Sequence, residues 1–140
     1  MKFFFTITKK RLLTALCILI VAIITAFWFL SVKADYIDGS THQKRFEFIR
    51  SLNLVIDEKN ITCKETFIPD TFGDVYNKYN QLQQKSGFNL KNYKGRKVTV
   101  YTYNIDNKNC ELHLIVCDGK IIGGDIAEIE INGEMKPLKR

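Results

Sequence analysis

The sequence CELHLIVCDGKIIGGD, residues 110–125, predicts an antiparallel β-hairpin. Its central Asp118-Gly119 pair is typical of a type I′ turn, which joins two strands through a two-residue loop. Before the turn, even-numbered apolar residues alternate with an odd-numbered set that includes Glu111 and His113. Because the side chains of a strand project alternately to its two faces, we expect the even-numbered face to be the drier one.

Further strands are predicted on both sides of this hairpin. Residues 98–105 are rich in β-branched and aromatic side chains, and the segment after the turn continues in this way to residue 131. Asn132-Gly133 then indicates another turn, which leads into a short edge segment that Pro137 ends. We therefore expect an antiparallel meander.

Two helices are predicted upstream of the meander. Ser40 and Gln43 form a capping box for a first helix of about twelve residues. The second helix is expected to begin with Asp70 or Thr71 as N-cap and to run to about residue 86, before Gly87. Its apolar stripe falls within an arc of about 120° and is interpreted as core. The stripe comprises Phe72, Val75, Tyr76, Tyr79 and Leu82.

Two short strands are expected between the helices. They cover residues 54–56 and 61–68, and Glu58-Lys59-Asn60 is expected to turn the chain between them. The predicted order is thus helix, two strands, helix and meander. This order indicates an α+β domain, in which an antiparallel β-meander packs against one or two helices.

The amino-terminal segment is expected to cross a membrane. Residues 12–32 include no charged side chain, and a helix of that length spans roughly 30 Å, the thickness of a bilayer core. Lys9, Lys10 and Arg11 precede it, so the positive-inside rule places the N-terminus in the cytoplasm and the C-terminal domain outside the cell. Cleavage of a signal peptide after Ala34 is the alternative.

This reading divides the chain into four parts. They are a basic cytoplasmic tail at 1–11, a transmembrane signal anchor at 12–32, a linker at 33–41 and an extracytoplasmic α+β domain at 42–140.

The net positive charge of the chain comes almost entirely from the residues before the domain. The whole chain has 21 basic and 15 acidic residues, a net charge of +6. Residues 1–33 hold five of the basic residues and no acidic one, so the rest of the chain is close to neutral. We therefore expect no nucleic-acid partner. The expected partners are the lipid bilayer, through residues 12–32, and a protein of the cell envelope.

The sequence contains no familiar catalytic or metal-binding motif. It has no P-loop, Rossmann fingerprint or G-x-S-x-G elbow. His42 and His113 are its only histidines and it has no C-x-x-C, so neither a metal nor a cofactor is expected. Cys110 and Cys117 end one predicted strand, roughly 23 Å apart, too far for a disulfide. Cys63 could pair with either, or all three could stay reduced.

Five residues are candidates for a binding site: Asn80, Gln83, Gly123, Gly124 and Asp125. Gln83 lies within the apolar arc of the second helix, where it either bonds an otherwise unpaired backbone group or contacts a ligand. Gly123-Gly124 interrupts a strand, either as a bulge or as backbone opened for a ligand, with Asp125 as the polar contact. No second acid, histidine or nucleophile is tied to Asp125 by spacing, so no catalytic residue is expected.

Four motifs resemble a bacterial family known as domain of unknown function 4830. They are IPxxFxxVYxxYNxLQ at 68–83, GxxLxxYKG at 87–95, YTY at 101–103 and DGKIIGGD at 118–125. The likeness covers about residues 43–128. It implies a small protein with an N-terminal membrane segment, and it implies no particular activity.

The preferred hypothesis is a membrane-tethered, extracytoplasmic binding or interaction module rather than an enzyme. The alternative is an envelope enzyme or enzyme regulator whose site is assembled from dispersed residues. A third hypothesis is a thiol-based sensor that uses Cys63, Cys110 or Cys117.

Overall fold

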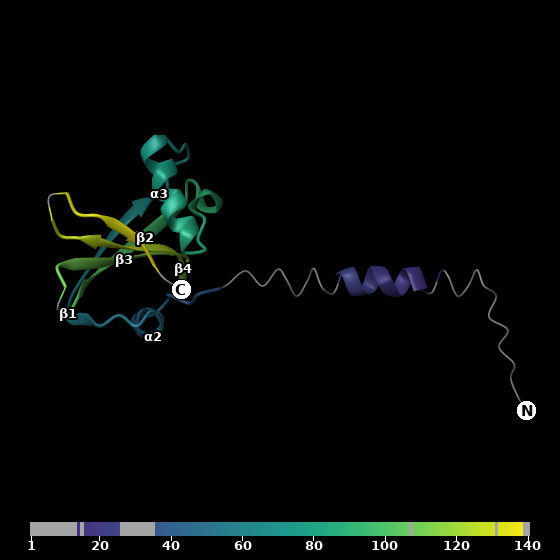
Figure 1. Ribbon diagram of the computed structural model, residues 1–140, viewed down its shortest axis with the longest axis horizontal. Helices are drawn as coiled ribbons and strands as arrows, with labels where there is room; N and C mark the ends of the chain where they lie inside the picture. The colour runs from purple at the N-terminus through teal and green to yellow at the C-terminus, as the bar shows by residue number, and fades with distance from the viewer. Residues whose placement is uncertain (1–13, 15, 26–35, 107, 131, 139–140) are drawn as a thin grey trace, which may run out of the picture. The chain divides into compact units, whose positions relative to one another are not determined.

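An antiparallel sheet of five strands forms the centre of the C-terminal part of the chain, residues 36–140 (Figure 1). The computed structural model describes residues 14, 16–25, 36–106, 108–130 and 132–138. The chain divides into two compact units, Met1–Asp35 and Tyr36–Arg140, and the second contains the whole sheet.

The first unit is described only at residues 14 and 16–25, which are helical and exposed. Within this part of the chain, no helix is long and apolar enough to cross a membrane. The remainder of the anchor expected at residues 12–32 lies outside the described residues.

The second unit has the expected α+β composition. The elements follow one another as α2 (His42–Ser51), β1 (Ile56–Phe67), α3 (Asp74–Lys85), the 3₁₀ helix η1 (Leu90–Tyr93), β2 (Lys97–Ile105), β3 (Cys110–Cys117), β4 (Lys120–Glu128) and β5 (Met135–Pro137). The strands lie in the sheet in the order in which they occur in the chain, β1 to β5, and all neighbours are antiparallel. The predicted meander is confirmed.

The turn between β3 and β4 is the predicted one. Asp118 has a φ of 47° and Gly119 a φ of 76°, the two positive values that a type I′ turn requires. The edge segment that was expected to end at Pro137 is β5.

The prediction of two strands at 54–56 and 61–68 is wrong, because a single strand, β1, covers this region. Its pairing with β2 shifts between Ile56 and Ile61, so the residues between them bulge out of the ladder. The Asp57 carboxylate accepts hydrogen bonds from the Lys59 N–H, at 2.9 Å, and from Asn60 Nδ2, at 2.6 Å. This local bonding bends the chain without reversing it.

Both helices begin later than expected. Thr41, not Ser40, is the N-cap of α2, and its hydroxyl accepts the Lys44 N–H. The Ser40 hydroxyl instead donates to Asp38 at 2.6 Å. Helix α3 begins after Gly73 rather than after Asp70 or Thr71.

The late start of α3 follows from the pairing that precedes it. Ile68 exchanges backbone hydrogen bonds with the turn before β2, since its N–H donates to Arg96 and its carbonyl accepts from Gly95. These bonds hold the chain extended after residue 68, so the helix forms only beyond that segment.

The two helices pack on opposite faces of the sheet, as the positions of α2 and α3 in Figure 1 show. On β3, Leu112 and Leu114 belong to the core on the α2 side, whereas Ile115 and Cys117 belong to the core on the α3 side. The even-numbered face is therefore buried as expected, but the odd-numbered face is buried as well where α3 covers it.

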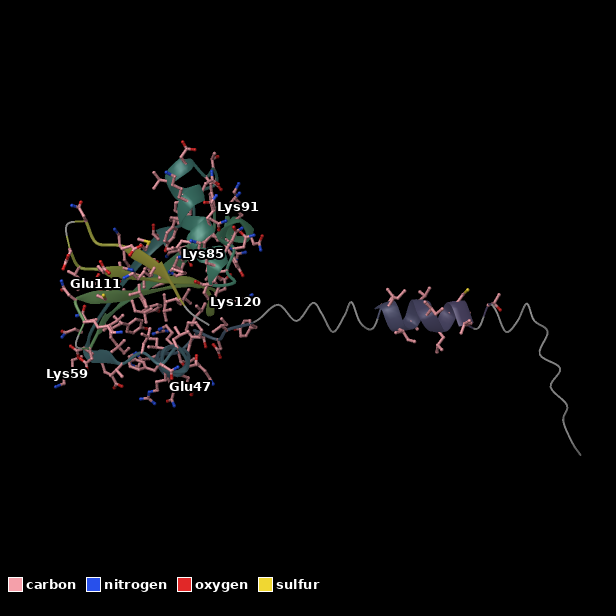
Figure 2. The ribbon with its side chains drawn as sticks, viewed as in Figure 1. Glu47, Lys59, Lys85, Lys91, Glu111 and Lys120 are labelled. Carbon is pink, nitrogen blue, oxygen red and sulfur yellow. The ribbon has the colours of Figure 1, made fainter. Side chains whose placement is uncertain are left out.

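Each helix covers only part of its face. Helix α3 packs near the Asp118-Gly119 turn, and α2 packs nearer the other end of the strands. Figure 2 shows these two ends, marked by Lys120 and Glu111. Two areas stay at least partly exposed. We name them the hairpin half-face, on the α2 side (Glu65, Lys97, Thr99 and Tyr101), and the His113 half-face, on the α3 side (Thr62, Thr102, Asn104, Glu111 and His113).

The chain before α2 lies along the outer edge of β4. Asp38 forms an isolated bridge with Lys120, and the Ile37 carbonyl accepts the Ile121 N–H at 2.9 Å. Part of the segment expected as a linker, residues 33–41, is therefore paired with the sheet.

Substitution of Gly119 by alanine should destabilise the domain by about 1 kcal/mol or more, because the new Cβ would be strained at positive φ and would lie 3.1 Å from Ser40 Cβ. Gly73→Ala is the matched control, since its φ is −74° and nothing lies within 4 Å of its added Cβ. Urea denaturation of both variants measures the difference. Equal losses would contradict the assigned turn geometry.

Candidate functional site

A β-bulge in β4 determines the geometry of the candidate site. Ile115 of β3 pairs with Gly123, whereas Val116 pairs with Ile121. Ile122 is thus the extra residue of β4. A bulge of this kind lets two residues of one strand oppose one residue of its neighbour.

The bulge changes the face to which Asp125 projects. A regular hairpin with Cys117 opposite Lys120 would place His113 opposite Gly124, and Asp125 would then project to the α2 side. The extra residue instead pairs His113 with Asp125. Both side chains therefore project to the α3 side and lie next to each other.

Helix α3 bonds the sheet directly beside the bulge. The Gly124 N–H donates to Gln83 Oε1 at 2.8 Å, and Gln83 is fully buried. A Cβ on Gly123 would lie 3.0 Å from the same oxygen, and a Cβ on Gly124 would lie 2.6 Å from the His113 carbonyl oxygen. Both glycines are therefore needed for the close approach of neighbouring groups within the chain, and Gln83 is the backbone acceptor that one of its interpretations predicted.

Asn80 has a similar role one helical turn earlier. Its Oδ1 accepts the Leu90 N–H at 2.7 Å, and its Nδ2 donates to Asn89 Oδ1 at 3.3 Å. The amide thereby fastens η1 to α3.

Asp125 links α3 to β3. Its carboxylate is 1% exposed; Oδ1 accepts the Tyr79 hydroxyl at 2.6 Å, and Oδ2 lies 3.1 Å from His113 Nδ1. With Nδ1 protonated, the imidazole donates to Asp125 and its orientation is fixed. The Nε2 atom of the same ring lies 3.5 Å from Glu111 Oε2. Tyr79, Asp125, His113 and Glu111 thus form one continuous polar network.

The network favours a protonated imidazole at its exposed end. The hydrogen bond to Asp125 raises the pKa of His113 more than burial lowers it, and Glu111 adds to the increase. Burial, followed by the charge of Asp125, raises the pKa of Tyr79, so the phenol stays a hydrogen-bond donor. The side chain of His113 is 23% exposed, whereas Asp125 beneath it is not accessible.

The raised pKa couples His113 to stability. The folded protein holds the His113 proton more tightly than the unfolded chain does. The resulting stabilisation is complete below the ordinary histidine pKa of about 6.5, and it is lost as the pH rises through the folded pKa.

All five candidate residues are buried, and the structure brings four of them together around the bulge: Gln83, Gly123, Gly124 and Asp125. Gln83 touches Gly124, Asp125 bonds Tyr79, and Asn80 faces η1 instead. The spacing of the sequence ties no histidine to Asp125, yet His113 lies directly across from it in the sheet. In a regular hairpin register His113 would lie opposite Gly124, so the sequence alone does not indicate the His113–Asp125 pair. The pair follows only if the strand is given a bulge next to the two glycines.

One known protein family matches the part of the chain that contains these residues. A family model described as Domain of unknown function (DUF4830) matches residues 48–126. The chain belongs to this family. The DUF4830 match extends from α2 to β4 and includes Gln83, His113 and Asp125. No curated protein and no solved structure matches the chain.

The three cysteines of the DUF4830 domain are free thiols. Cys63 is exposed on β1, Cys110 is half-buried and Cys117 is buried. Burial raises the pKa of the Cys117 thiol, which disfavours the reactive thiolate. Among the described residues, no group of three or more His, Cys, Asp and Glu side chains could hold a metal ion.

Gln83→Leu should destabilise the domain by about 1–3 kcal/mol, because it leaves the Gly124 N–H without its acceptor. The matched control is Gln84→Leu, an exposed position on the same helix, with an expected change within about 0.5 kcal/mol. Native-state hydrogen exchange should accelerate at the Gly124 amide in the first variant only. Unchanged exchange there would show that this bond contributes nothing.

Asp125→Asn should lower the pKa of His113, because it removes the negative charge that holds the imidazole proton. An NMR titration of the ring resonances measures this change. If the pKa of His113 is the same in both proteins, the assigned network is refuted.

Proposed function

We propose that this DUF4830 protein is a membrane-tethered binding module that acts on the outer side of the cell membrane, and that its binding surface is the His113 half-face. The observation that carries the proposal is the oriented, partly exposed imidazole of His113, held from beneath by the buried Asp125. Polar groups at defined positions fix the orientation of a bound partner and provide specificity.

The surroundings of His113 suit a polar partner. Thr102 and Asn104 provide half-buried polar side chains, and the exposed Lys64 adds a positive charge on the same side of the sheet. The raised pKa of His113 favours a second positive charge. Glu111 neutralises part of this charge, so the partner would present a carboxylate or a carbonyl that competes with Glu111 for the imidazole.

The five buried candidate residues would then act by positioning. Gln83 and the two glycines maintain the bulge, and the bulge holds Asp125 against His113. In this proposal the partner touches the exposed end of the network, whereas Asn80 keeps η1 packed on α3.

The tether is supported by the sequence. Residues 12–32 have no charge, and basic residues 9–11 precede them. Anchored in this way, the N-terminus would lie in the cytoplasm and the domain would face the cell envelope.

Catalysis by the same histidine is the second candidate. An imidazole oriented by a buried carboxylate is also the arrangement of a general base. However, Nε2, the atom that such a base would use, faces the Glu111 carboxylate. This contact favours binding over catalysis, because Glu111 occupies the place beside Nε2 where a general base would hold the nucleophile that it deprotonates.

A photo-crosslinking residue placed at Thr102 in living cells tests the proposal. We expect crosslinks to one envelope protein, and a strong reduction of them when His113→Gln is added, because the proposed contact is then lost. Peptides of the bait that precede residue 35 would show that the N-terminal segment is retained.

The control position is Glu47, on the exposed side of α2 (Figure 2). The same crosslinked products from both positions, or products that do not depend on His113, would contradict the proposed surface. Circular dichroism of the purified variants would verify that each is folded.

A further inference from the structure

Acidic side chains are concentrated at one end of the sheet. The antiparallel register places the starts of β1 and β3 beside the ends of β2 and β4, and we name this region the acidic end. Among the described residues, its carboxylates outnumber its basic side chains. They are Asp57, Glu58, Asp106, Glu111, Glu128, Glu130 and Glu134, with Arg50, Lys59, Lys108 and Lys136.

Lysines without an ionic partner lie toward the opposite end, on α3 and η1 and at the start of β4. Within the described part of the chain, none of them takes part in an ion pair. We name them the lysine end: Lys78, Lys85, Lys91, Lys94 and Lys120. Figure 2 shows Lys85, Lys91 and Lys120 on one side of the domain, with Lys59 and Glu111 on the other.

The other charges near the lysine end do not balance these lysines. Arg96 pairs with Asp118, and Lys97 pairs with Glu65 at 2.9 Å, so these four charges cancel. Fewer carboxylates than lysines remain there without an ion pair among the described residues. They are Asp38, Asp70 and Asp74. An excess of positive charge is therefore left at this end.

The N-terminal segment joins the domain beside the lysine end. The Ile37 carbonyl accepts the Ile121 N–H of β4 at 2.9 Å. Leu90 of η1 reaches the same part of β4, because a Cβ on Gly123 would lie 3.1 Å from Leu90 Cδ2. The incoming chain and the start of η1 thus meet β4 at nearby positions.

The side chains at this junction suit a membrane surface. Tyr36 is 64% exposed, and the Lys120 ammonium lies 5.9 Å from the centre of its ring. Tyrosine rings favour the membrane–water interface, and the apolar stem of a lysine lets its ammonium extend to the headgroups. Because the lysines of this end are not held in ion pairs within the described part of the chain, they can follow mobile headgroups.

We propose that the lysine end docks on anionic lipid headgroups at the outer surface of the membrane. The inference rests on the proposed tether at residues 12–32. Residues 33–35 separate that segment from Tyr36, and a chain of this length reaches at most about 14 Å. The tether would thus keep the lysine end near the bilayer, where an anionic surface attracts each lysine. The same surface would repel the acidic end.

Docking in this orientation would leave the proposed binding surface accessible. The His113 half-face includes Asn104 and Glu111, which pair with each other at the acidic end of the sheet. With the lysine end on the membrane, this half-face would point away from the bilayer and would be open to a partner.

The test uses the full-length protein in lipid nanodiscs, made either of phosphatidylcholine alone or of phosphatidylcholine with phosphatidylglycerol. Both contain a trace of phosphatidylcholine with a nitroxide on its headgroup, which accelerates the relaxation of nearby amide protons. Relaxation at Lys85 and Lys91 should be at least about twofold faster in the anionic nanodiscs, because the lysines are attracted to phosphatidylglycerol. The Glu111 amide should relax equally in both. Salt at about 0.5 M should remove the difference by screening.

Matched double variants locate the contact. Lys85→Glu with Lys91→Glu should abolish the effect of phosphatidylglycerol. Lys59→Glu with Lys108→Glu changes the net charge by the same amount at the acidic end and should retain the effect. All four lysines are exposed, and the amide spectrum of each variant in phosphatidylcholine nanodiscs verifies that it is folded.

The proposal is overturned if relaxation at Lys85 and Lys91 is the same in both kinds of nanodisc, as it would be if an acidic protein were the partner. Equal loss of the effect in both double variants overturns it as well. The comparison of lipids uses the unmodified protein, so it does not depend on a variant being folded. A protein that does not enter the nanodiscs at all would refute the tether itself, which is distinct from an anchored protein that ignores phosphatidylglycerol.

Discussion

One hydrogen bond, from the Gly124 N–H to Gln83 Oε1, connects the geometry of the sheet with that of helix α3. It lies beside the bulge at Ile122, where the ladder between β3 and β4 is shifted. The bulge turns Asp125 toward α3, and there the carboxylate can bond Tyr79 and His113 at once. Without this shift, the same carboxylate would face the apolar core on the α2 side. The site therefore depends on a single extra residue and on the helix that accommodates it.

Local chemistry explains which parts of the fold could be predicted. The type I′ turn at Asp118-Gly119 needs only two residues with positive φ, so the hairpin and the meander are visible in the sequence. Gln83 and the two glycines also stand out, because a polar residue in an apolar stripe and glycines within a strand both break a local rule. His113 does not stand out, since its pairing with Asp125 depends on a one-residue shift in register. The hydrogen bond that stabilises this shift joins Gly124 to Gln83, 41 residues earlier in the chain.

The starts of both helices differ from the local sequence pattern for a related reason. Serine is a residue type that favours the N-cap, yet the Ser40 hydroxyl donates to Asp38 instead. Thr41 is therefore the residue that caps α2. The start of α3 depends on backbone bonds between Ile68 and the distant turn at residues 95–96. In both cases a competing partner decides which residue begins the helix, and the identity of that partner follows from the tertiary structure rather than from the local pattern.

The bend in β1 has a further consequence for solubility. The outer side of β4 is flanked by residue 38 and by β5, whereas β1 forms the opposite edge of the sheet and, among the described residues, pairs with β2 alone. Unprotected edge strands can recruit strands of other molecules and start aggregation. In β1 the bulge at Asp57 interrupts the straight edge, and the exposed charges of Lys64 and Glu65 occupy the regular part. The same segment that departs from the predicted turn thus protects the sheet from edge-to-edge association.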